Sequence, residues 1–322
     1  MLTLGRFSYP QPLVVLAPMA GVSDLPFRQL CQRFGADFTV AEMVSAKPDL
    51  LATGLSQRRL AFDDDRRFPR IVQLLGADPA LMAAAAQRLV AAGADVIDVN
   101  LGCPAAAVAK RAAGSALLAD LPAVGRLLRA LRAAVAVPLT LKTRLGDRDK
   151  KAIFTVMMLA AEHGFSLIAL HGRTRAQRFS GPVDYDCLGR VAEQSPLPVL
   201  ANGDIGDAAQ AAELLGRYPL AGVMIGRASQ GRPQLFAQCQ NRINGRGLAE
   251  TLAPVLIRDH LRALQEHYGP AGLLIGRRHL HHYLRPRPDY EHWRPRINAA
   301  ADPAAQLALG AEIWGPAFSG EI

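Results

Sequence analysis

The chain alternates between short apolar runs and alanine- and leucine-rich stretches, and this pattern recurs eight times over about 225 residues. The apolar runs are short and rich in aliphatic side chains, as buried strands are; they cover residues 14–17, 38–41, 70–74, 96–99, 139–143, 167–171, 199–201 and 222–225. Most of the stretches between these runs have the composition of helices, for example 81–92, 123–134, 151–163 and 208–215. Gly93, Gly164 and Gly216 stand where the C-caps of such helices are expected.

Eight strand–helix units predict a parallel sheet that closes into a (β/α)8 barrel of the α/β class. The rival is an open, doubly wound sheet. It is disfavoured because no G-x-G-x-x-G follows the first strand, where a dinucleotide fold would carry it.

The pattern changes after about residue 245, where strand-like runs stop. Helices are predicted at about 254–268, 270–284 and 303–313. We therefore expect two domains, a barrel over residues 1–245 and a smaller all-helical domain over residues 246–322, together a TIM barrel with an appendage.

Composition narrows the class of protein. No apolar stretch approaches the roughly 18 residues that span a bilayer, and the start shows no basic segment followed by an apolar one, so neither a membrane span nor a secretory signal is expected. Four widely spaced cysteines without a C-x-x-C pair argue against a zinc site or a disulfide framework. We expect a cytoplasmic monomer without a metal; its formal charge of +9 makes a polyanionic partner plausible.

Polar or conformationally special residues follow all eight predicted strands. Because the C-terminal ends of barrel strands converge on one mouth, these residues should meet there. They are Pro18, Met19 and Ala20 with Gly21, Glu42 with Met43, Gln73, Asn100 with Cys103, Lys142 with Arg144, His171 with Arg173, Asn202, Gly203 and Asp204, and Gly226 with Arg227. Singly, Gln73 or His171 could be structural, but eight of eight at one end indicate an active site.

Lys142 carries the strongest individual signal, because a lysine within a strand is rarely buried without a partner. A barrel lysine can form a Schiff base, contact a phosphate or stabilise an anionic cofactor. The last two strand ends, at 202–204 and 226–227, coincide with the usual phosphate site of such barrels. The sequence thus predicts a phosphorylated ligand there, with Lys142 over its reactive part.

Cys103 stands in the motif Asn-Leu-Gly-Cys-Pro at 100–104, just past a buried strand. As a nucleophile it would need a base such as His171; as a general acid it need only remain a thiol, as cysteine does at neutral pH. A third interpretation is an inert core residue, the default for Cys31, Cys187 and Cys239.

Residues 277–296 hold six arginines, four histidines and three aromatic residues against two acids. Arginine grips phosphates and aromatic rings stack on unpaired bases, so this mixture suits RNA. Arg277, Arg278, Arg285 and Arg287 are the candidate contacts. The alternative is a solvated helix face.

Taken together, these residues resemble the tRNA-dihydrouridine synthase family over almost the whole chain, most closely its bacterial B-type branch. The matching segments are 17–24, 72–74, 100–104, 114–118, 141–142, 171–174, 201–205, 224–228 and 268–270, with Arg278-His279 in the helical tail.

The resemblance implies an FMN-bearing barrel that reduces the C5=C6 bond of a uridine in tRNA, expected in the D-loop, with NADPH or NADH as reductant. Hydride would pass from the flavin to C6, and Cys103 would protonate C5 from the opposite face. By motif matching, the flavin would contact Pro18, Met19, Ala20, Gln73, Lys142, His171, Asn202, Gly203, Asp204, Gly226 and Arg227. Asn100 would meet the uracil and Arg173 would lie near the substrate.

Two segments depart from the family pattern. The family usually has a lysine and an asparagine soon after the Cys-Pro pair, whereas residues 105–109 here are nearly all alanine, and no tryptophan follows Gly146. Other functions stay open: an FMN barrel acting on a free small molecule such as dihydroorotate, a lyase or aldolase with Lys142 as Schiff base, and a non-catalytic RNA-binding protein.

Overall fold

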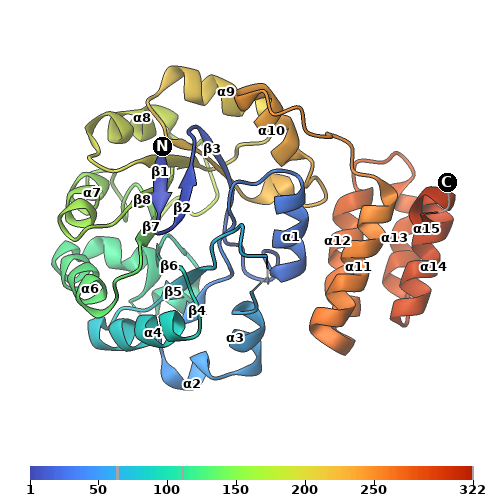
Figure 1. Ribbon diagram of the computed structural model, residues 1–322, viewed down its shortest axis with the longest axis horizontal. Helices are drawn as coiled ribbons and strands as arrows, with labels where there is room; N and C mark the ends of the chain where they lie inside the picture. The colour runs from blue at the N-terminus through green and yellow to red at the C-terminus, as the bar shows by residue number, and fades with distance from the viewer. Residues whose placement is uncertain (63–64, 111, 321–322) are drawn as a thin grey trace.

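The computed structural model describes residues 1–62, 65–110 and 112–320, and it shows a barrel with a group of helices at its side (Figure 1). Eight strands form one parallel sheet in the order β3-β10-β9-β8-β7-β6-β5-β4. They are β3 (Leu13–Leu16), β4 (Val44–Ser45), β5 (Ile71–Leu75), β6 (Val96–Leu101), β7 (Leu139–Arg144), β8 (Leu167–His171), β9 (Val199–Asn202) and β10 (Gly222–Ile225). The predicted (β/α)8 barrel is confirmed.

The barrel closes through the segment at 38–41, which was predicted to be a regular strand. That prediction was wrong in detail, because this segment makes only isolated parallel bridges, from Thr39 to Leu16 and from Val40 to Ile71. Just before it, the carboxylate of Asp37, and not a backbone carbonyl, accepts a hydrogen bond from Val14 N at 2.7 Å. Asp37 N also donates to the Val14 carbonyl at 2.9 Å and Leu16 N to the Phe38 carbonyl at 3.3 Å, so this segment pairs with β3 through a mixture of side-chain and backbone hydrogen bonds.

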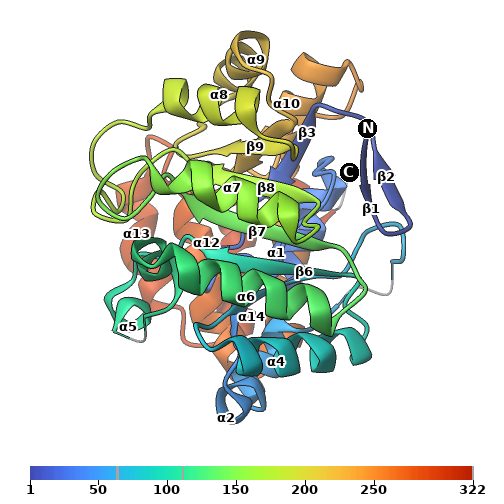
Figure 2. The ribbon, with the colours of Figure 1, turned by 90° about the vertical axis from the view of Figure 1, so that its left-hand side faces the viewer.

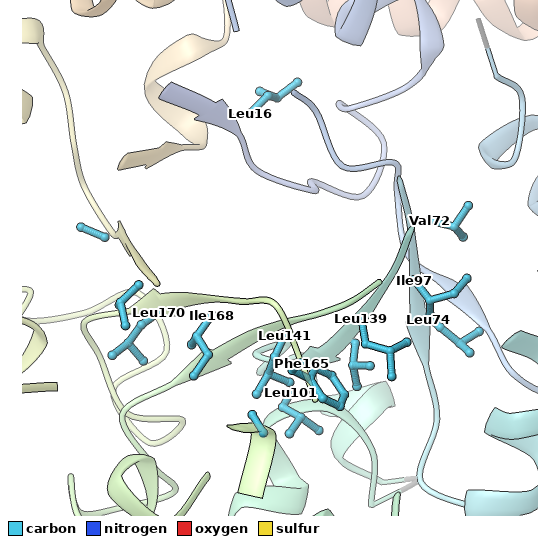
Figure 3. Close-up of a cluster of buried hydrophobic side chains, with 14 of the residues drawn as sticks. Leu16, Val72, Leu74, Ile97, Leu101, Leu139, Leu141, Phe165, Ile168 and Leu170 are labelled. Atoms are coloured by element: carbon cyan, nitrogen blue, oxygen red, sulfur yellow. The ribbon is translucent and has the colours of Figure 1, made fainter. Parts of the chain in front are cut away.

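Side chains alternate between the two faces of each strand. Outward-facing residues of β5 to β8, such as Val72, Ile97, Leu141 and Ile168, are buried against the surrounding helices (Figure 3). Inward-facing residues are apolar near the strand starts and polar near the ends. On β8, for example, the apolar Leu167 and Ala169 precede His171 on the inner face. The sheet thus carries its polar groups to one end of the barrel.

A short hairpin that the sequence did not predict covers the opposite end. Its strands are β1 (Leu2–Leu4) and β2 (Phe7–Tyr9). Leu2 and Leu4 are buried in the same apolar cluster as Leu13, Val96 and other inner residues. The barrel floor is therefore closed by hydrophobic packing.

Helices surround the sheet, and α4, α6, α7 and α8 lie on the outside of the strands, on the side that faces the viewer in Figure 2. The barrel helices are α1 (Leu25–Arg33), α2 (Pro48–Leu51), α3 (Gly54–Arg59), α4 (Pro79–Ala91), α5 (Ala106–Ala109), α6 (Leu121–Ala134), α7 (Ala152–Glu162), α8 (Tyr185–Gln194), α9 (Ala208–Arg217) and α10 (Leu235–Asn244), with 3-10 turns at Gly114–Ala119 and Arg227–Ser229.

Several of these helices begin in the same way. The aspartates Asp24, Asp78 and Asp120 each accept a hydrogen bond from a backbone N–H of the first turn, and a proline follows within two residues. Gly93 and Gly164 follow α4 and α7 with positive φ, as predicted. Gly216 does not cap α9, because that helix continues through Arg217.

The C-terminal helices lie together beside the barrel, on the side of α1 (Figure 1). They are α11 (Pro254–Tyr268), α12 (Gly272–Leu284), α13 (Tyr290–Ala299), α14 (Pro303–Trp314) and α15 (Pro316–Ser319), with a 3-10 turn at Gly269–Ala271. Leu261, Leu280, Leu284 and Ile297 belong to an apolar core of their own. The sequence predicted α11, α12 and α14 but missed three helices: α10, although it buries Leu235, Phe236 and Cys239 at helical spacing, α13, which is polar and buries only Ile297, and the short α15.

Contacts through α1 and its N-cap join these helices to the barrel. Phe27 of α1 packs against the rings of His260 and His279, at centroid distances of 5.8 and 5.4 Å. The Tyr268 hydroxyl donates to the carboxylate of Asp24 at 3.2 Å. None of the helices described is long and apolar enough to cross a membrane.

Candidate active site

A cavity of about 690 Å³ opens at the C-terminal ends of the strands. Most residues predicted for the mouth line it: Pro18, Met19, Ala20, Met43, Gln73, Asn100, Cys103, Lys142, Arg144, His171, Asn202, Gly203, Asp204, Gly226 and Arg227. Gly21 and Glu42 do not line it, because the buried Glu42 carboxylate accepts a hydrogen bond from Gly21 N at 2.6 Å and forms an ion pair with Arg59. Arg173, predicted to lie near the substrate, does not line the cavity; its guanidinium donates to the Gly181 carbonyl and to the cavity-lining Asp204. The volume is typical of a site for a cofactor-sized ligand.

The backbone around Cys103 is held on both sides. Its N–H donates to Asn100 Oδ1 at 2.9 Å, and its carbonyl accepts from the Ser115 hydroxyl at 2.8 Å. Gly114, at φ +62°, allows this approach, because a Cβ there would lie 3.0 Å from the Cys103 carbonyl oxygen. The side chain is partly exposed on the cavity. The loop therefore presents the thiol in a fixed place.

Arg144 ties the Cys103 loop to the loop after β8. Its Nε donates to the Gly102 carbonyl at 2.7 Å, and Nη1 donates to the carbonyls of Thr174 and Arg178 at 3.1 and 2.7 Å. Burial, then the charge of Arg173, lowers the pKa of Arg144 to about 10, which leaves it charged at neutral pH. Arg144 thus fixes two walls of the cavity relative to each other.

Lys142 is a cation inside the barrel with an amide as its partner. Its Nζ donates to Asn202 Oδ1 at 2.7 Å, and Asn202 Nδ2 donates to the Met224 carbonyl at 2.7 Å. No carboxylate in the described part of the chain forms an ion pair with it. Burial, followed by the charge of Arg144, lowers its pKa to about 8. A desolvated cation of this kind is poised to receive an anionic ligand.

His171 lies beside Lys142 and Arg173, buried in the wall. Burial is the main cause that holds the pKa of its imidazole far below the usual range, and the nearby charges of Lys142, Arg144 and Arg173 add to it. The ring is therefore neutral, and it lies 3.5 Å from Arg173 Nη1. No hydrogen bond joins it to Cys103 within the described residues, which disfavours the nucleophile interpretation of that cysteine.

Asp204 bridges two arginines at the rim. One carboxylate oxygen accepts from Arg173 and the other from Arg227, and these hydrogen bonds and charges hold the pKa of Asp204 below its usual value. Gly203, at φ +122°, must be glycine, because a Cβ would lie 2.6 Å from the His171 ring. The exposed ring of Phe179 lies under the guanidinium groups of Arg144 and Arg227, at 5.4 and 5.0 Å.

A second hollow, of about 710 Å³, lies between α12 and α13, and we call it the basic groove. It is lined by Arg278, His281, His282, Arg285, Tyr290, Glu291, Arg294 and Asn298. Arg278 also donates to the Gly21 carbonyl at 2.7 Å, beside the cavity-lining Ala20, so the groove adjoins the mouth.

The four arginines predicted for RNA contact fall into two groups. Arg278 and Arg285 line the basic groove and are exposed. Arg277 instead donates to the Ala300 carbonyl at 2.9 Å. Arg287 forms a two-point ion pair with Asp289, at 2.8 Å for both contacts. The structure therefore brings two of the four together and turns the other two to local contacts.

Sequence reasoning missed Asp98 and Phe179, and it gave Arg144 no role. Asp98 lies under Gln73 and Asn100, and its position two residues before Asn100 puts it on the same inner face, a signal that was available. Arg144 was noted at a strand end without a role. Phe179 lies in a loop and carries no periodic signal.

The fold and the site define this protein as a (β/α)8 barrel whose polar mouth holds a fixed thiol after β6 and a desolvated lysine on the adjacent β7. Its chain belongs to the dihydrouridine synthase family, whose model matches residues 15–313.

Known proteins agree with this assignment. The tRNA-dihydrouridine synthase B of Pseudomonas putida is 44% identical over 311 residues, covering 95% of this chain and 92% of that protein. That of Vibrio parahaemolyticus is 42% identical over 303 residues, covering 92% and 93%. Among solved structures, histamine dehydrogenase from Rhizobium sp. 4-9 has a TM-score of 0.53 at 13% identity over 78% of this chain and 48% of that one, a likeness of fold.

Proposed function

We propose that the chain is an FMN-dependent tRNA-dihydrouridine synthase that uses NADPH or NADH to reduce the C5=C6 bond of a uridine in the tRNA D-loop. Family membership supports the reaction, and the relatives are named for it. The observation that carries the proposal is Cys103, fixed after β6 at the mouth of a cavity to which the adjacent β7 supplies Lys142 and β9 supplies Asn202.

The residues around the cavity fit FMN. Lys142 has a partner that is neutral, so a ligand with negative charge would compensate its burial. Arg227 and the turn that begins at Gly226 lie where barrels of this kind bind phosphate. When bound, FMN supplies hydride chemistry, accepting hydride from the nicotinamide and giving one to C6 of the uracil.

Cys103 then acts as the proton donor. Hydride addition at C6 places negative charge on the C4–C5 side of the uracil, and a neutral acid beside C5 lowers that barrier. The S–H bond breaks, the new C5–H bond forms, and the thiolate regains a proton from solvent. Asn100, whose Oδ1 holds the Cys103 loop, also lines the cavity where the uracil would lie.

The helical region supplies the tRNA contact in this proposal. We assign residues 1–245 to the catalytic domain and 246–322 to a tRNA-binding domain. The basic groove reaches the mouth through Arg278, so phosphates in the groove and an extruded uridine in the cavity could belong to one RNA. A free small molecule such as dihydroorotate would make no use of that groove.

The test is dihydrouridine formation in tRNA that lacks it. Such tRNA, from a strain without dihydrouridine synthases, is incubated with the FMN-loaded protein and NADPH, and modified positions are mapped by mass spectrometry. The proposal expects dihydrouridine at one or more D-loop positions. Flavin reduction without any dihydrouridine, together with turnover of dihydroorotate, would favour the small-molecule alternative.

A further inference from the structure

Asp98 lies on the inner face of β6, one layer below the cavity floor, and is 3% exposed. In the sheet register it stands directly between Gln73 of β5 and Thr140 of β7. Gln73 Nε2 donates to its Oδ2 at 2.7 Å, and the Thr140 hydroxyl donates to its Oδ1 at 2.7 Å. Both carboxylate oxygens are therefore used within the barrel.

The hydrogen bonds continue from Asp98 to the Cys103 loop. Gln73 Oε1 accepts from Asn100 Nδ2 at 2.7 Å. Asn100 Oδ1 in turn accepts from Gly102 N at 3.0 Å and from Cys103 N at 2.9 Å. Two consecutive side-chain amides thus connect a buried carboxyl group to the backbone that carries the thiol.

The direction of this chain of hydrogen bonds is set at both of its ends. A carboxylate oxygen accepts and does not donate, so the NH2 group of Gln73 must face Asp98 and its carbonyl must face Asn100. If Asp98 binds a proton on Oδ1, the Thr140 hydroxyl can turn to accept it, and Oδ2 still accepts from Gln73. If both amides were turned round, the NH2 group of Asn100 would face the backbone N–H groups of Gly102 and Cys103, so that donors would face donors.

We propose that Asp98 is a positioning residue for Cys103: it fixes the orientation of the Gln73 and Asn100 amides, and thereby holds the Gly102 and Cys103 backbone on Asn100 Oδ1. This inference rests on the proposed function for the role of Cys103, but the hydrogen-bond chain is independent of it. The residue touches neither the cavity nor the reacting atoms.

Two isosteric variants separate an accepting oxygen from the charge. Asp98→Leu removes the acceptor, and Asp98→Asn keeps one oxygen for Gln73 while its NH2 group donates to the Thr140 hydroxyl. The matched control is Thr143→Val, which also makes a buried polar residue of the same sheet apolar but leaves the chain of amides untouched. If the leucine variant does not fold, Asp98→Ala removes the same acceptor without added bulk.

The direct measurement is hydrogen exchange of the Gly102 and Cys103 amides, followed by mass spectrometry on a peptide covering 100–104. We expect exchange about tenfold faster in Asp98→Leu, as for the loss of one net hydrogen bond, and near-parent exchange in Asp98→Asn and Thr143→Val. Unchanged exchange in the leucine variant overturns the proposal. So does an asparagine variant as fast as the leucine one, because charge would then be the cause.

The second measurement is reoxidation of the prereduced, FMN-saturated enzyme by tRNA in a single turnover. We expect a fall of about 10- to 100-fold in Asp98→Leu, within the range of a mispositioned proton donor, and less than threefold in Asp98→Asn. Faster exchange with an unchanged reoxidation rate also overturns the proposal. Cys103→Ala is measured in the same assay to separate the two proposals. If its reoxidation is slow, an unchanged rate in Asp98→Leu rejects the role of Asp98; if its reoxidation is at the parent rate, the proposed role of Cys103 is rejected instead.

Discussion

The buried charge of Lys142 should make the flavin-free barrel less stable, although the same charge helps to bind the flavin. Burial lowers its pKa from 10.5 to about 8. At about 1.4 kcal/mol for each tenfold change, this corresponds to about 3 kcal/mol at neutral pH, where the lysine is charged in both the folded and the unfolded chain. Lys142→Met removes that cost. It also leaves Asn202 Oδ1 without its donor, and the lysine is partly exposed to solvent in the cavity, so we expect a net stabilisation of about 1–2 kcal/mol.

The sign of the pH dependence follows from the same pKa. Between about pH 8 and 10.5 the unfolded parent chain binds more protons than the folded one, so the stability of the parent rises with pH. The advantage of Lys142→Met should therefore shrink towards pH 10. Urea unfolding of flavin-free protein at pH 7 and pH 10 measures both values.

The matched control is Lys151→Met, the same change at an exposed lysine, where we expect less than about 0.5 kcal/mol. With FMN present the order should reverse, since the variant loses the cation that faces the ligand and should retain flavin less well. A Lys142→Met protein that is less stable than the parent when flavin-free, or whose difference does not change with pH, would refute the reasoning.

Two further predictions concern the contact between the helices and the barrel, and the groove. Burial is the main reason that the pKa of Asp24 is raised to about 6, so the folded protein loses stability as the pH rises from about 4 to 6 and the carboxyl group ionises. In urea unfolding, Asp24→Asn should therefore stabilise the protein by about 1–3 kcal/mol at pH 7.5 and by almost nothing at pH 4. An equal gain at both pH values would contradict this. Replacing Arg278 and Arg285 by alanine should weaken tRNA binding in filter-binding assays and reduce the dependence of the binding constant on salt by about two phosphate contacts. Arg287→Ala breaks a local ion pair with Asp289 and should leave that salt dependence nearly unchanged. An equal salt dependence for the two variants would reject the groove as the RNA contact.

The fold was predictable because the period of the apolar runs is a direct consequence of burial. Strands such as β3 and β8 are buried on both faces, and their residues appear as continuous apolar runs, of which the one in β8 ends in the polar His171. The segment at 38–41 could not be judged in this way, because the Asp37 side chain takes part in its pairing with β3 beside two backbone hydrogen bonds. Nothing in the composition of β1 and β2 distinguishes a barrel floor from a surface loop.

The cavity lining was largely predictable, since parallel strands bring their C-terminal ends together whatever the loops do. The partners of the arginines were not. Arg277 and Arg287 stand in the same basic segment as Arg278 and Arg285, and only the packing of α12 against α13 decides which side chains reach a carbonyl or a carboxylate. Charge content predicts a patch, whereas the surrounding packing decides which charges remain free.

The proposed role of Cys103 is tested most directly by one single-turnover experiment. Cys103→Ala enzyme loaded with FMN is reduced by NADPH without oxygen and mixed with tRNA that lacks dihydrouridine, and flavin reoxidation is followed by absorbance. Cys187→Ala, a buried thiol in α8, is the matched control. We predict normal reduction by NADPH and reoxidation slowed by about 10²- to 10⁴-fold in Cys103→Ala alone. Reoxidation of the Cys103→Ala enzyme at the parent rate would contradict the assignment of Cys103 as the proton donor.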